Sequence, residues 1–497
     1  MSEPSATTEN QFIHRSKIWQ VGFFSLNNAA TNLYFFLIGL VSYYATGIAG
    51  LAVVVVSTIL TALRIFDGIT DPIIGFIIDR TNTRFGKFRP FMVLGNSILA
   101  VSTIIMFMVT HHVPEGLRLM FFIGMYAIHI IGYTFQAVCT RAAQTVLTND
   151  PKQRPLFSAF DATFTTLIFV GGQVVLASYL VPKYGGQFSE ALFTELVTYG
   201  VTIGAIFTIL AVIGIWKKDR LEYFGFAEKS VKTKFSDYWP VIKRNRPLQM
   251  LVIAASTDKL ANSVLRQPAV PVMFFGILIG NYALSGTIQM ITILPTLLIT
   301  YIGIGIARKA GMKRIFVYGT WAALLCFAGV LGLLMIIDPA TISLINMGLN
   351  TFLFLALYGL GMGFAGLTGN MVIPMIADTS DYETHITGRY VPGMISTIFS
   401  FVDKLISSLA TTIVGFLLAS IGFREVFPQV GDEMTSSLLI MTLVFQFGFP
   451  MFGWVASLLA MKFYELNGKR MNEIQDEIAG VKKILVAKNQ ITIPEPE

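Results

Sequence analysis

Long apolar stretches, each roughly 20 residues or more, recur along the whole chain and are separated by polar loops. A hydrocarbon core about 30 Å thick requires about 20 apolar residues to cross it as a helix, because each residue adds about 1.5 Å. That core holds no water, so the backbone of such a segment must form its hydrogen bonds internally, as an α-helix does. The pattern therefore predicts an all-α membrane protein.

The composition and the motif content support this class. Of the 497 residues, 54% are apolar and 13% are charged, whereas soluble globular proteins carry about 25% charged residues. The formal net charge of +7 lies in particular loops, which indicates membrane topology and not nucleic-acid binding. Cys139 and Cys326 lie in separate apolar stretches, which argues against a disulfide framework or a metal site. The sequence carries no phosphate-binding glycine loop, nucleophile motif or zinc motif, and so does not indicate an enzyme.

Helix breakers and charges divide the chain into twelve predicted spans. They cover residues 18–46, 50–79, 90–111, 118–146, 156–181, 191–216, 248–280, 284–307, 314–337, 342–376, 392–422 and 435–464. Alternate loops hold most of the Lys and Arg residues, which the positive-inside rule assigns to the cytoplasm. An even number of spans then predicts that both termini are cytoplasmic.

The polar segment 217–247 lies near the middle of the chain and predicts a cytoplasmic linker between two halves. The expected domains are a cytoplasmic tail (1–17), a six-helix bundle (18–216), the linker (217–247), a second six-helix bundle (248–464) and a cytoplasmic tail (465–497). GKFRPFMVLG from Gly86 resembles GMKRIFVYG from Gly311, at matching places in the two halves. Duplicated six-helix halves are the arrangement of the major facilitator fold.

Ionisable side chains inside the spans are candidates for functional sites, because each costs at least about 2.5–3.5 kcal/mol at bilayer depth. In RIFDGITDPIIGFIIDR of the second span, Arg64, Asp67 and Asp71 share one helical face. Two carboxylates this close in a low dielectric either hold a proton or recruit a small cation. Thr70 supplies a hydroxyl oxygen, and Arg64 neutralises one carboxylate in the empty site. We therefore predict that Asp67, Asp71 and Thr70 bind a coupling cation, Na⁺ or H⁺; the alternative is a buried structural ion-pair network.

Polar residues in three other spans are candidates for contact with a substrate. Arg141 and Asp161 are predicted to reach similar depths in the fourth and fifth spans, where they either pair with each other or contact a polar substrate. In the first span, Asn27 and Asn28 offer donors and acceptors for sugar hydroxyls or for interhelical hydrogen bonds.

The eleventh and seventh predicted spans also carry charges. Asp403 and Lys404 are adjacent, so helical geometry turns only one of them toward a central cavity, and we expect that residue to be Lys404. Asp258, Lys259 and Arg266 fit an ion pair or a gate equally well.

Two longer blocks resemble the glycoside/pentoside/hexuronide:cation symporter family, to which melibiose permease belongs. They are DGITDPIIGFIIDRTNTRFGKFRP in the second span and its loop, and ADTSDYETHITGRYVPGMISTIFSFVDKL at the expected start of the eleventh span. The resemblance implies a major facilitator transporter that moves a sugar or glycoside with Na⁺, H⁺ or Li⁺ by alternating access. It further implies that Asp67 and Asp71 are the cation-site carboxylates, that Arg64 is the arginine preceding them, and that Lys404 is the lysine near both sites.

The chain departs from melibiose permease at several substrate positions. The Lys-Asp pair of its first helix appears here as Asn27 and Asn28. The aspartate of its fourth helix falls at Ala137 and the sugar-contacting tryptophan at Arg141, while the arginine of its fifth helix falls at Asp161 or Ala162. A reversed pair argues against α-galactosides as the substrate, and the missing carboxylate makes H⁺ coupling as plausible as Na⁺ coupling.

Together these patterns predict a monomeric, cation-coupled symporter of a small sugar or glycoside in the cytoplasmic membrane, with no cofactor beyond the coupling cation and the lipid bilayer as its surroundings. Within the transporter class, the alternative is a sugar exchanger or a carrier of hexuronides and other acidic glycosides, because Arg141 suits a carboxylate. A lipid transporter of the same fold is less favoured.

Overall fold

The computed structural model describes residues 14–81, 83–148, 153, 155–220, 238–388, 392–474 and 476–477. Within these residues the regular secondary structure is helical, apart from one isolated bridge between Thr83 and Gly86. The first half contains α1 (Ile18–Gly39), α2 (Val41–Gly47), α3 (Val53–Arg80), α4 (Arg89–Met108), η2 (Thr110–His112), α5 (Glu115–Ala142), α6 (Gln144–Leu147), α7 (Pro155–Val174), η3 (Val175–Leu180), α8 (Val181–Lys183) and α9 (Glu190–Ile215).

The second half follows the predicted linker, of which residues 221–237 lie outside the described part. It contains α10 (Tyr238–Arg244), α11 (Arg246–Leu265), α12 (Ala269–Pro271), η6 (Val272–Leu278), α13 (Ala283–Ala310), α14 (Met312–Ile336), η7 (Pro339–Thr341), α15 (Leu349–Thr387), α16 (Pro392–Ser420), α17 (Ser436–Leu443), η8 (Val444–Gly448) and α18 (Phe449–Lys462). In the described residues, eleven helical stretches are long and apolar enough to cross a membrane.

The segment predicted as the seventh span is helical but interrupted. Its first part, α11, ends at Leu265, and the chain continues through α12 into the π-helical η6. Pro268 accounts for the break, because a proline disfavours helical backbone at the residue before it. Charged residues such as Asp258 and Lys259 also keep α11 too polar to count among the eleven candidate spans.

The helix predicted over 342–376 extends further than expected. It is α15, with 39 residues, and at about 1.5 Å per residue it is roughly 58 Å long, well beyond the thickness of a hydrocarbon core. Pro374 lies inside this helix without ending it, and Gly388 ends α15 in the left-handed conformation with φ 68°. The ADTSDYETHIT part of the second family block therefore ends α15, and does not begin the next span; α16 begins at Pro392.

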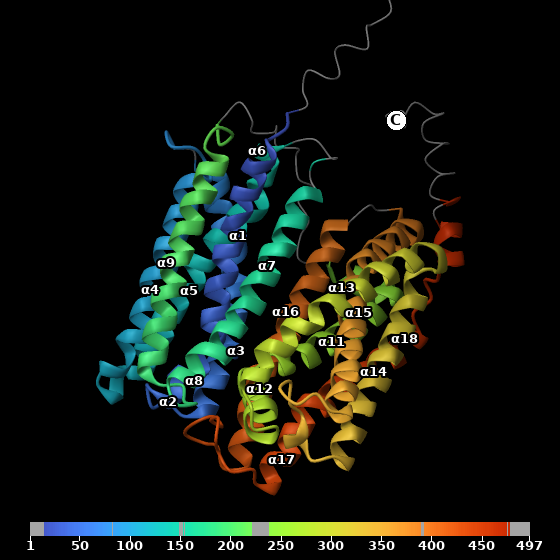
Figure 1. Cartoon of the computed structure of the whole chain (residues 1–497). Coiled ribbons are helices and arrows are strands. Elements are labelled where there is room, and N and C mark those ends of the chain that lie inside the picture. The colour runs from blue at the N-terminus through green and yellow to red at the C-terminus, as the bar shows by residue number, and fades with distance from the viewer. Residues whose placement is uncertain are drawn as a thin grey trace, which may run out of the picture. The chain divides into compact units, whose positions relative to one another are not determined.

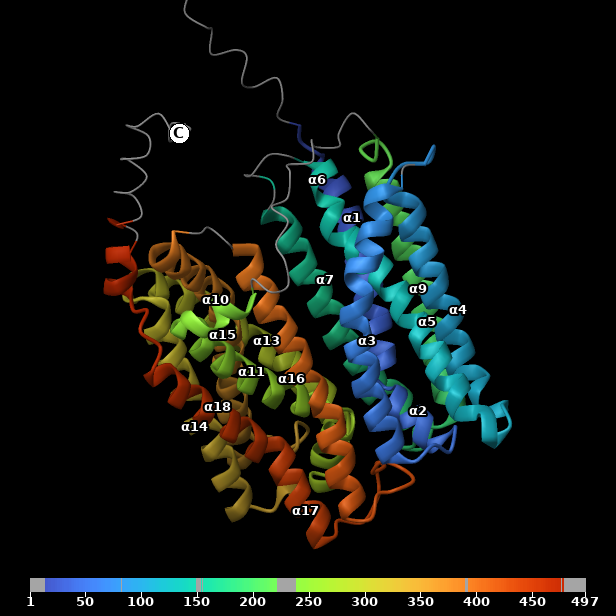
Figure 2. The same cartoon turned by 180° about the vertical axis from the view of Figure 1, so that it is seen from behind.

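The chain forms two compact units. The first unit contains Met1–Ser230, Pro271–Thr287 and Thr411–Glu433, and the second contains Val231–Val270, Ile288–Ala410 and Met434–Glu497. Figures 1 and 2 show the helices from opposite sides, and in the first unit α4, α5, α7 and α9 surround α1.

Small residues on α9 bring it close to α1. A Cβ at Gly204 would lie 2.9 Å from the buried ring of Tyr34, and one at Gly214 would lie 2.8 Å from the backbone nitrogen of Phe24. Close backbone approach through small residues is the usual means of packing membrane helices, for which burial of apolar surface supplies little driving force. In the second unit, Trp454 of α18 packs against Phe327 of α14 with 4.9 Å between ring centroids.

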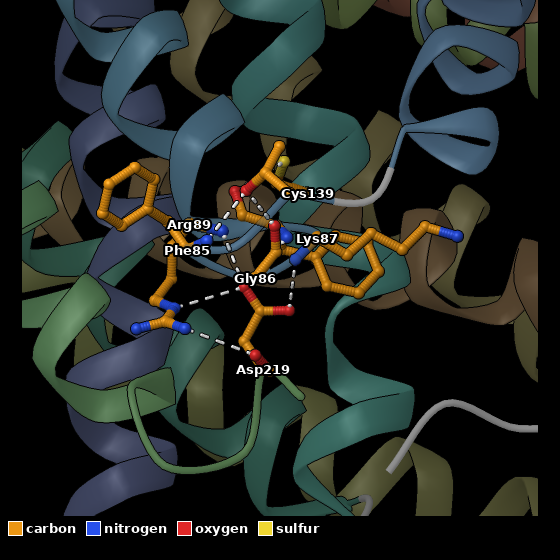
Figure 3. A network of polar contacts seen from close by, with 8 residues as sticks. Phe85, Gly86, Lys87, Arg89, Cys139 and Asp219 are labelled. Atoms are coloured by element: carbon orange, nitrogen blue, oxygen red, sulfur yellow. Dashed lines mark hydrogen bonds and ion pairs between the residues drawn. The ribbon is translucent and has the colours of Figure 1, made fainter. Parts of the chain in front are cut away.

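Asp219, just after α9, fixes the loop between α3 and α4 (Figure 3). Its buried carboxylate accepts hydrogen bonds from the backbone N–H groups of Lys87, Phe88 and Arg89 at 2.9–3.0 Å and forms a 3.4 Å ion pair with the Arg89 guanidinium. These N–H groups lie at the start of α4, where a helix leaves its amide donors unsatisfied, so the carboxylate acts as the cap. Gly86 has φ 106°, and a side chain there would clash with Asp219.

Candidate functional site

Asp67 and Thr70 lie on the buried face of α3, each with 6% of its surface exposed. The Thr70 hydroxyl donates to the Asp67 carbonyl at 2.9 Å and lies 3.1 Å from the hydroxyl of Thr134 on α5. Two of the predicted cation-site residues therefore face α5 together. Asp71 lies one turn further along α3, but its side chain is outside the described part of the structure.

Arg64, one turn before Asp67, contacts aromatic residues. Its guanidinium carbon lies 4.9 Å from the centroid of the Phe35 ring on α1. Tyr126 of α5 is buried and lies close enough to Arg64 and Asp67 to interact electrostatically with both charges. The Arg64 guanidinium thus lies near the Asp67 carboxylate and against an aromatic ring. A guanidinium in this position is also suited to bind ligand oxygens.

A half-exposed face of α1 and α7 continues from Phe35. Asn28 interacts with the carboxylate of Asp161, and one turn later Asn32 donates to the Thr165 hydroxyl at 2.9 Å. Further along, Phe35 approaches the rings of Phe169 and of Tyr133 on α5, with centroids 6.1 and 6.2 Å apart. We call this surface the polar–aromatic face; its members are Asn28, Asn32, Phe35, Tyr133, Asp161, Thr165 and Phe169.

The polar–aromatic face has the chemistry of a sugar site. Amides, a hydroxyl and a carboxylate offer donors and acceptors to sugar hydroxyls, and the rings offer apolar contact surface. The Oδ1 atom of Asp161 is buried and has no hydrogen-bond partner among the described residues. An unmet acceptor of this kind is available to a ligand hydroxyl.

The two adjacent asparagines of α1 point to different neighbours. Asn27 is fully buried and donates to the Gln136 carbonyl at 3.2 Å and to the Thr140 hydroxyl at 2.8 Å, both on α5. Of the two predicted alternatives, this geometry favours interhelical hydrogen bonding for Asn27. Asn28 faces α7 and Asp161, where substrate contact remains a prediction.

The structure does not bring Arg141 and Asp161 together. Arg141 is exposed near the end of α5, and its Nε donates to the carbonyl of Ala137 on the same helix at 3.2 Å. Across the described parts of α5 and α7, no ion pair joins the two residues. The prediction that both residues reach similar depths was based on their distances from the loop between the two spans. Those distances do not determine the direction of each side chain.

The second unit holds the remaining predicted charges. Asp403 of α16 forms a 3.7 Å ion pair with Lys259 of α11, whereas Lys404, its neighbour, is exposed. Asp258 is buried and accepts a 2.8 Å hydrogen bond from the indole Nε1 of Trp454. The charges on α11 thus have separate partners, while Arg266 stands at its C-terminal cap.

Several residues of this site gave no signal in the sequence. Thr134, Asn32 and Thr165 are neutral, so their presence in a membrane helix costs too little to draw attention. Phe35 and Tyr133 belong to a chain with 41 Phe and 17 Tyr residues, most of which pack helices or face lipid. Helical spacing from Asn28, a predicted substrate residue, would have found Asn32 four residues later.

Comparison with known proteins identifies relatives over nearly the full length. The family described as MFS/sugar transport protein matches residues 23–468. A symporter of Bacillus subtilis, YnaJ, is 24% identical and covers 94% of this chain and 96% of its own. The glucuronide carrier protein homolog of Escherichia coli is 26% identical over 93% of this chain and 95% of its own, and the isoprimeverose transporter of Lactiplantibacillus pentosus is 23% identical over 93% and 92%.

Solved structures share the fold at low identity. The nucleoside transporter NupG (D323A mutant) has a TM-score of 0.60 at 12% identity and covers 90% of this chain and 100% of its own. A bacterial homologue of the iron transporter ferroportin in the inward-facing state also has a TM-score of 0.60, at 11% identity over 90% of this chain and 98% of its own.

Proposed function

The chain belongs to the MFS/sugar transport protein family, and from that premise we propose that it is a symporter that couples entry of Na⁺ or H⁺ to uptake of a sugar or glycoside. Family membership makes the chain a multi-pass membrane transporter and not an enzyme. The finer assignments, to a cation and to a class of substrate, rest on the geometry of the first unit.

The observation that carries the proposal is the position of Arg64. It lies one helical turn from Asp67, near Tyr126, and against Phe35 of the polar–aromatic face. In the empty site, its charge offsets that of Asp67. When a cation or proton neutralises Asp67, together with Asp71, the guanidinium is released to bind substrate oxygens. Cation binding thereby favours sugar binding, and by linkage the sugar tightens cation binding equally.

Two further predicted residues join this scheme, Lys404 by carry-over from the family and Arg141 because its guanidinium suits a polar substrate. Lys404 on α16 is proposed as a second basic group that senses the cation, and Arg141 is proposed to contact substrate from α5. Both side chains are exposed, as groups that meet a water-filled pathway would be.

An acidic glycoside is the second candidate for the substrate. Arg64 presents a planar cation on the polar–aromatic face, and a uronate carboxylate would match it bidentately. A glucuronide carrier protein homolog among the relatives supports the same class. Neutral and acidic sugars therefore both belong in the transport assay.

For the membrane topology, we propose twelve crossings with both termini in the cytoplasm. The seventh crossing is made by α11, α12 and η6, so that six-helix bundles over 18–216 and 248–464 flank the 217–247 linker. Interrupted helices are common in transporters where the backbone lines a cavity. The monomer is the proposed functional unit.

The test is transport into proteoliposomes that contain the purified chain. A panel of labelled neutral glycosides and uronides is offered while Na⁺ and pH gradients are imposed separately. We expect one class of sugar to accumulate above its external concentration under one of the gradients. Equal inside and outside concentrations under both gradients, for every sugar that enters, would contradict symport.

A further inference from the structure

A second cluster of polar side chains lies in the first unit, away from the polar–aromatic face. The short helix η2 carries His111 and His112 between α4 and α5, and Glu190 begins α9. One ligand atom from each residue lies within 4.8 Å of the other two. The two imidazole rings are 4.0 Å apart, and Nε2 of His111 is 3.4 Å from Oε1 of Glu190.

His111 shows an unmet bonding capacity. Its side chain is only 10% exposed, and Nε2 makes no hydrogen bond with any described residue. The carboxylate of Glu190, at 3.4 Å, is beyond good hydrogen-bond geometry. A buried ring nitrogen without a partner is unfavourable and calls for a ligand.

The other ring nitrogen of His111 has the partner that a metal-bound histidine needs. Nδ1 lies 2.8 Å from the hydroxyl of Tyr44 on α2. When Nδ1 carries the proton and donates it to this oxygen, the lone pair of Nε2 points toward Glu190. Metal-binding histidines almost always hold their second nitrogen in such a hydrogen bond, which fixes the tautomer and the ring orientation.

The spacing of the ligand atoms fits a tetrahedral metal. Ligand atoms about 2.0–2.2 Å from Zn²⁺ in a tetrahedron lie roughly 3.3–3.5 Å from one another. The 3.4 Å between His111 Nε2 and Glu190 Oε1 is in this range. His112 and Glu190 are exposed, so rotation of their side chains closes the remaining gap, and water fills the fourth position.

The backbone that carries the histidines is already fixed. Arg118 donates to the carbonyls of Ala49, His111 and Val113 at 2.8, 3.2 and 3.1 Å. These bonds also fix the position of its guanidinium, which keeps its positive charge. Because this backbone is already ordered, binding of a metal ion costs little further conformational entropy, and this favours metal affinity.

We propose that His111, His112 and Glu190 form a Zn²⁺ site. Two imidazoles and a carboxylate are ligands that suit Zn²⁺ and other borderline transition metals, not Na⁺ or Mg²⁺. The bound ion ties η2 to the start of α9, so it stabilises the packing of α4, α5 and α9. The site is independent of sugar transport and of the cation that drives it.

Zinc titration of the full chain in nanodiscs tests the site. The protein is purified without a histidine tag, stripped with a chelator, and titrated by calorimetry with ZnCl₂; Co²⁺ gives an independent signal, because four-coordinate Co²⁺ absorbs visible light. The wild type and Glu115→Gln, a control at the start of α5, are expected to bind one ion. Glu190→Gln and His111→Gln are expected to bind at least about tenfold more weakly.

Unfolding temperature supplies a second readout, since an ion that binds only the folded state raises it. We expect Zn²⁺ to raise the unfolding midpoint of the wild type and of Glu115→Gln, but not of Glu190→Gln. The Glu190 side chain is 58% exposed, so its replacement leaves the fold intact. Absence of saturable binding to the wild type, or wild-type affinity in Glu190→Gln, would overturn the proposal.

Discussion

At the scale of single residues, Arg64 is where the charged and the aromatic parts of the first unit meet. Replacing it with lysine keeps the charge but removes the planar group that lies over Phe35. The second hydrogen bond that a planar guanidinium can give to substrate oxygens contributes about 0.5–1.5 kcal/mol, so Arg64→Lys is expected to weaken sugar affinity by about 2- to 13-fold.

Sugar binding to the purified variant, measured at saturating cation, checks this prediction. Cation affinity in the absence of sugar serves as the control, because Asp67 still has a positive neighbour one turn away. Unchanged sugar affinity in Arg64→Lys would mean that the guanidinium does not contact the substrate.

Asp161 carries the second prediction at this scale. Its Oδ1 is buried without a hydrogen-bond partner among the described residues, and its interaction with Asn28 orients the carboxylate. Hydrogen bonds to charged groups contribute about 1.5–3 kcal/mol, so Asp161→Asn is expected to weaken sugar binding by roughly 10- to 150-fold. Thr166→Ala, which removes an exposed hydroxyl bonded only within α7, is the matched control and should bind normally. Equal affinities in both variants would remove Asp161 from the site.

The sequence could identify the charged members of the site but not the neutral ones. Arg64, Asp67 and Asp161 drew attention because ionisable groups inside a membrane are expensive. The sequence does not give the direction of each side chain, so it leaves open whether Arg141 and Asp161 pair with each other or contact a substrate. Glu190 could not be linked to His111 either, because only the packing of α9 against α4 brings them together.

At the scale of elements, the start of α4 depends on Asp219. Its carboxylate caps three backbone N–H groups and pairs with Arg89 in a buried position. Asp219→Ala leaves these donors unsatisfied and is expected to lower the free energy of unfolding by about 1–3 kcal/mol. Thermal unfolding in detergent measures the loss. Asp338→Ala, which removes an exposed cap at η7, is the comparison, and an equally small effect of both changes would contradict the role of Asp219.

The close packing of α1 on α9 predicts different effects of an added methyl group at two glycines, one inside this contact and one outside it. A Cβ at Gly204 would press on the buried Tyr34 ring, whereas one at Gly124 of α5 would meet nothing within 4 Å. Gly204→Ala should therefore destabilise the protein by about 1–3 kcal/mol, and Gly124→Ala should leave it unchanged or slightly more stable. The same unfolding assay separates them. Equal midpoints would show that α9 can move away from α1 without loss.

The sequence predicted that the main helices exist, but it predicted less well the residues at which they begin and end. The apolar stretches predicted the main helices, because a segment of that length and composition has no other stable form in lipid. Pro268 is a sequence signal for the interruption after α11, but the apolar stretch continues on both sides of it and so predicts one span. The extension of α15 to Thr387 has no signal in hydropathy, because its last turns are polar.

At the scale of the whole molecule, the proposed transporter couples the binding of a cation to the binding of a sugar. The family match covers residues 23–468, and eleven candidate spans lie in the described residues. The helical class and the family could be predicted from charge patterning and two sequence blocks. The assignment of 271–287 and 411–433 to the first compact unit could not, because it depends on long-range packing.

The central claim is that the coupling cation binds at Asp67 on α3. Gradient-driven sugar accumulation in proteoliposomes, compared between wild type and Asp67→Asn, tests it most directly; sugar exchange across the same membranes, without a gradient, reports whether the variant is folded. We expect Asp67→Asn to exchange sugar but to accumulate none above its external concentration. Uphill accumulation by Asp67→Asn with the same dependence on the gradient as the wild type would contradict the claim.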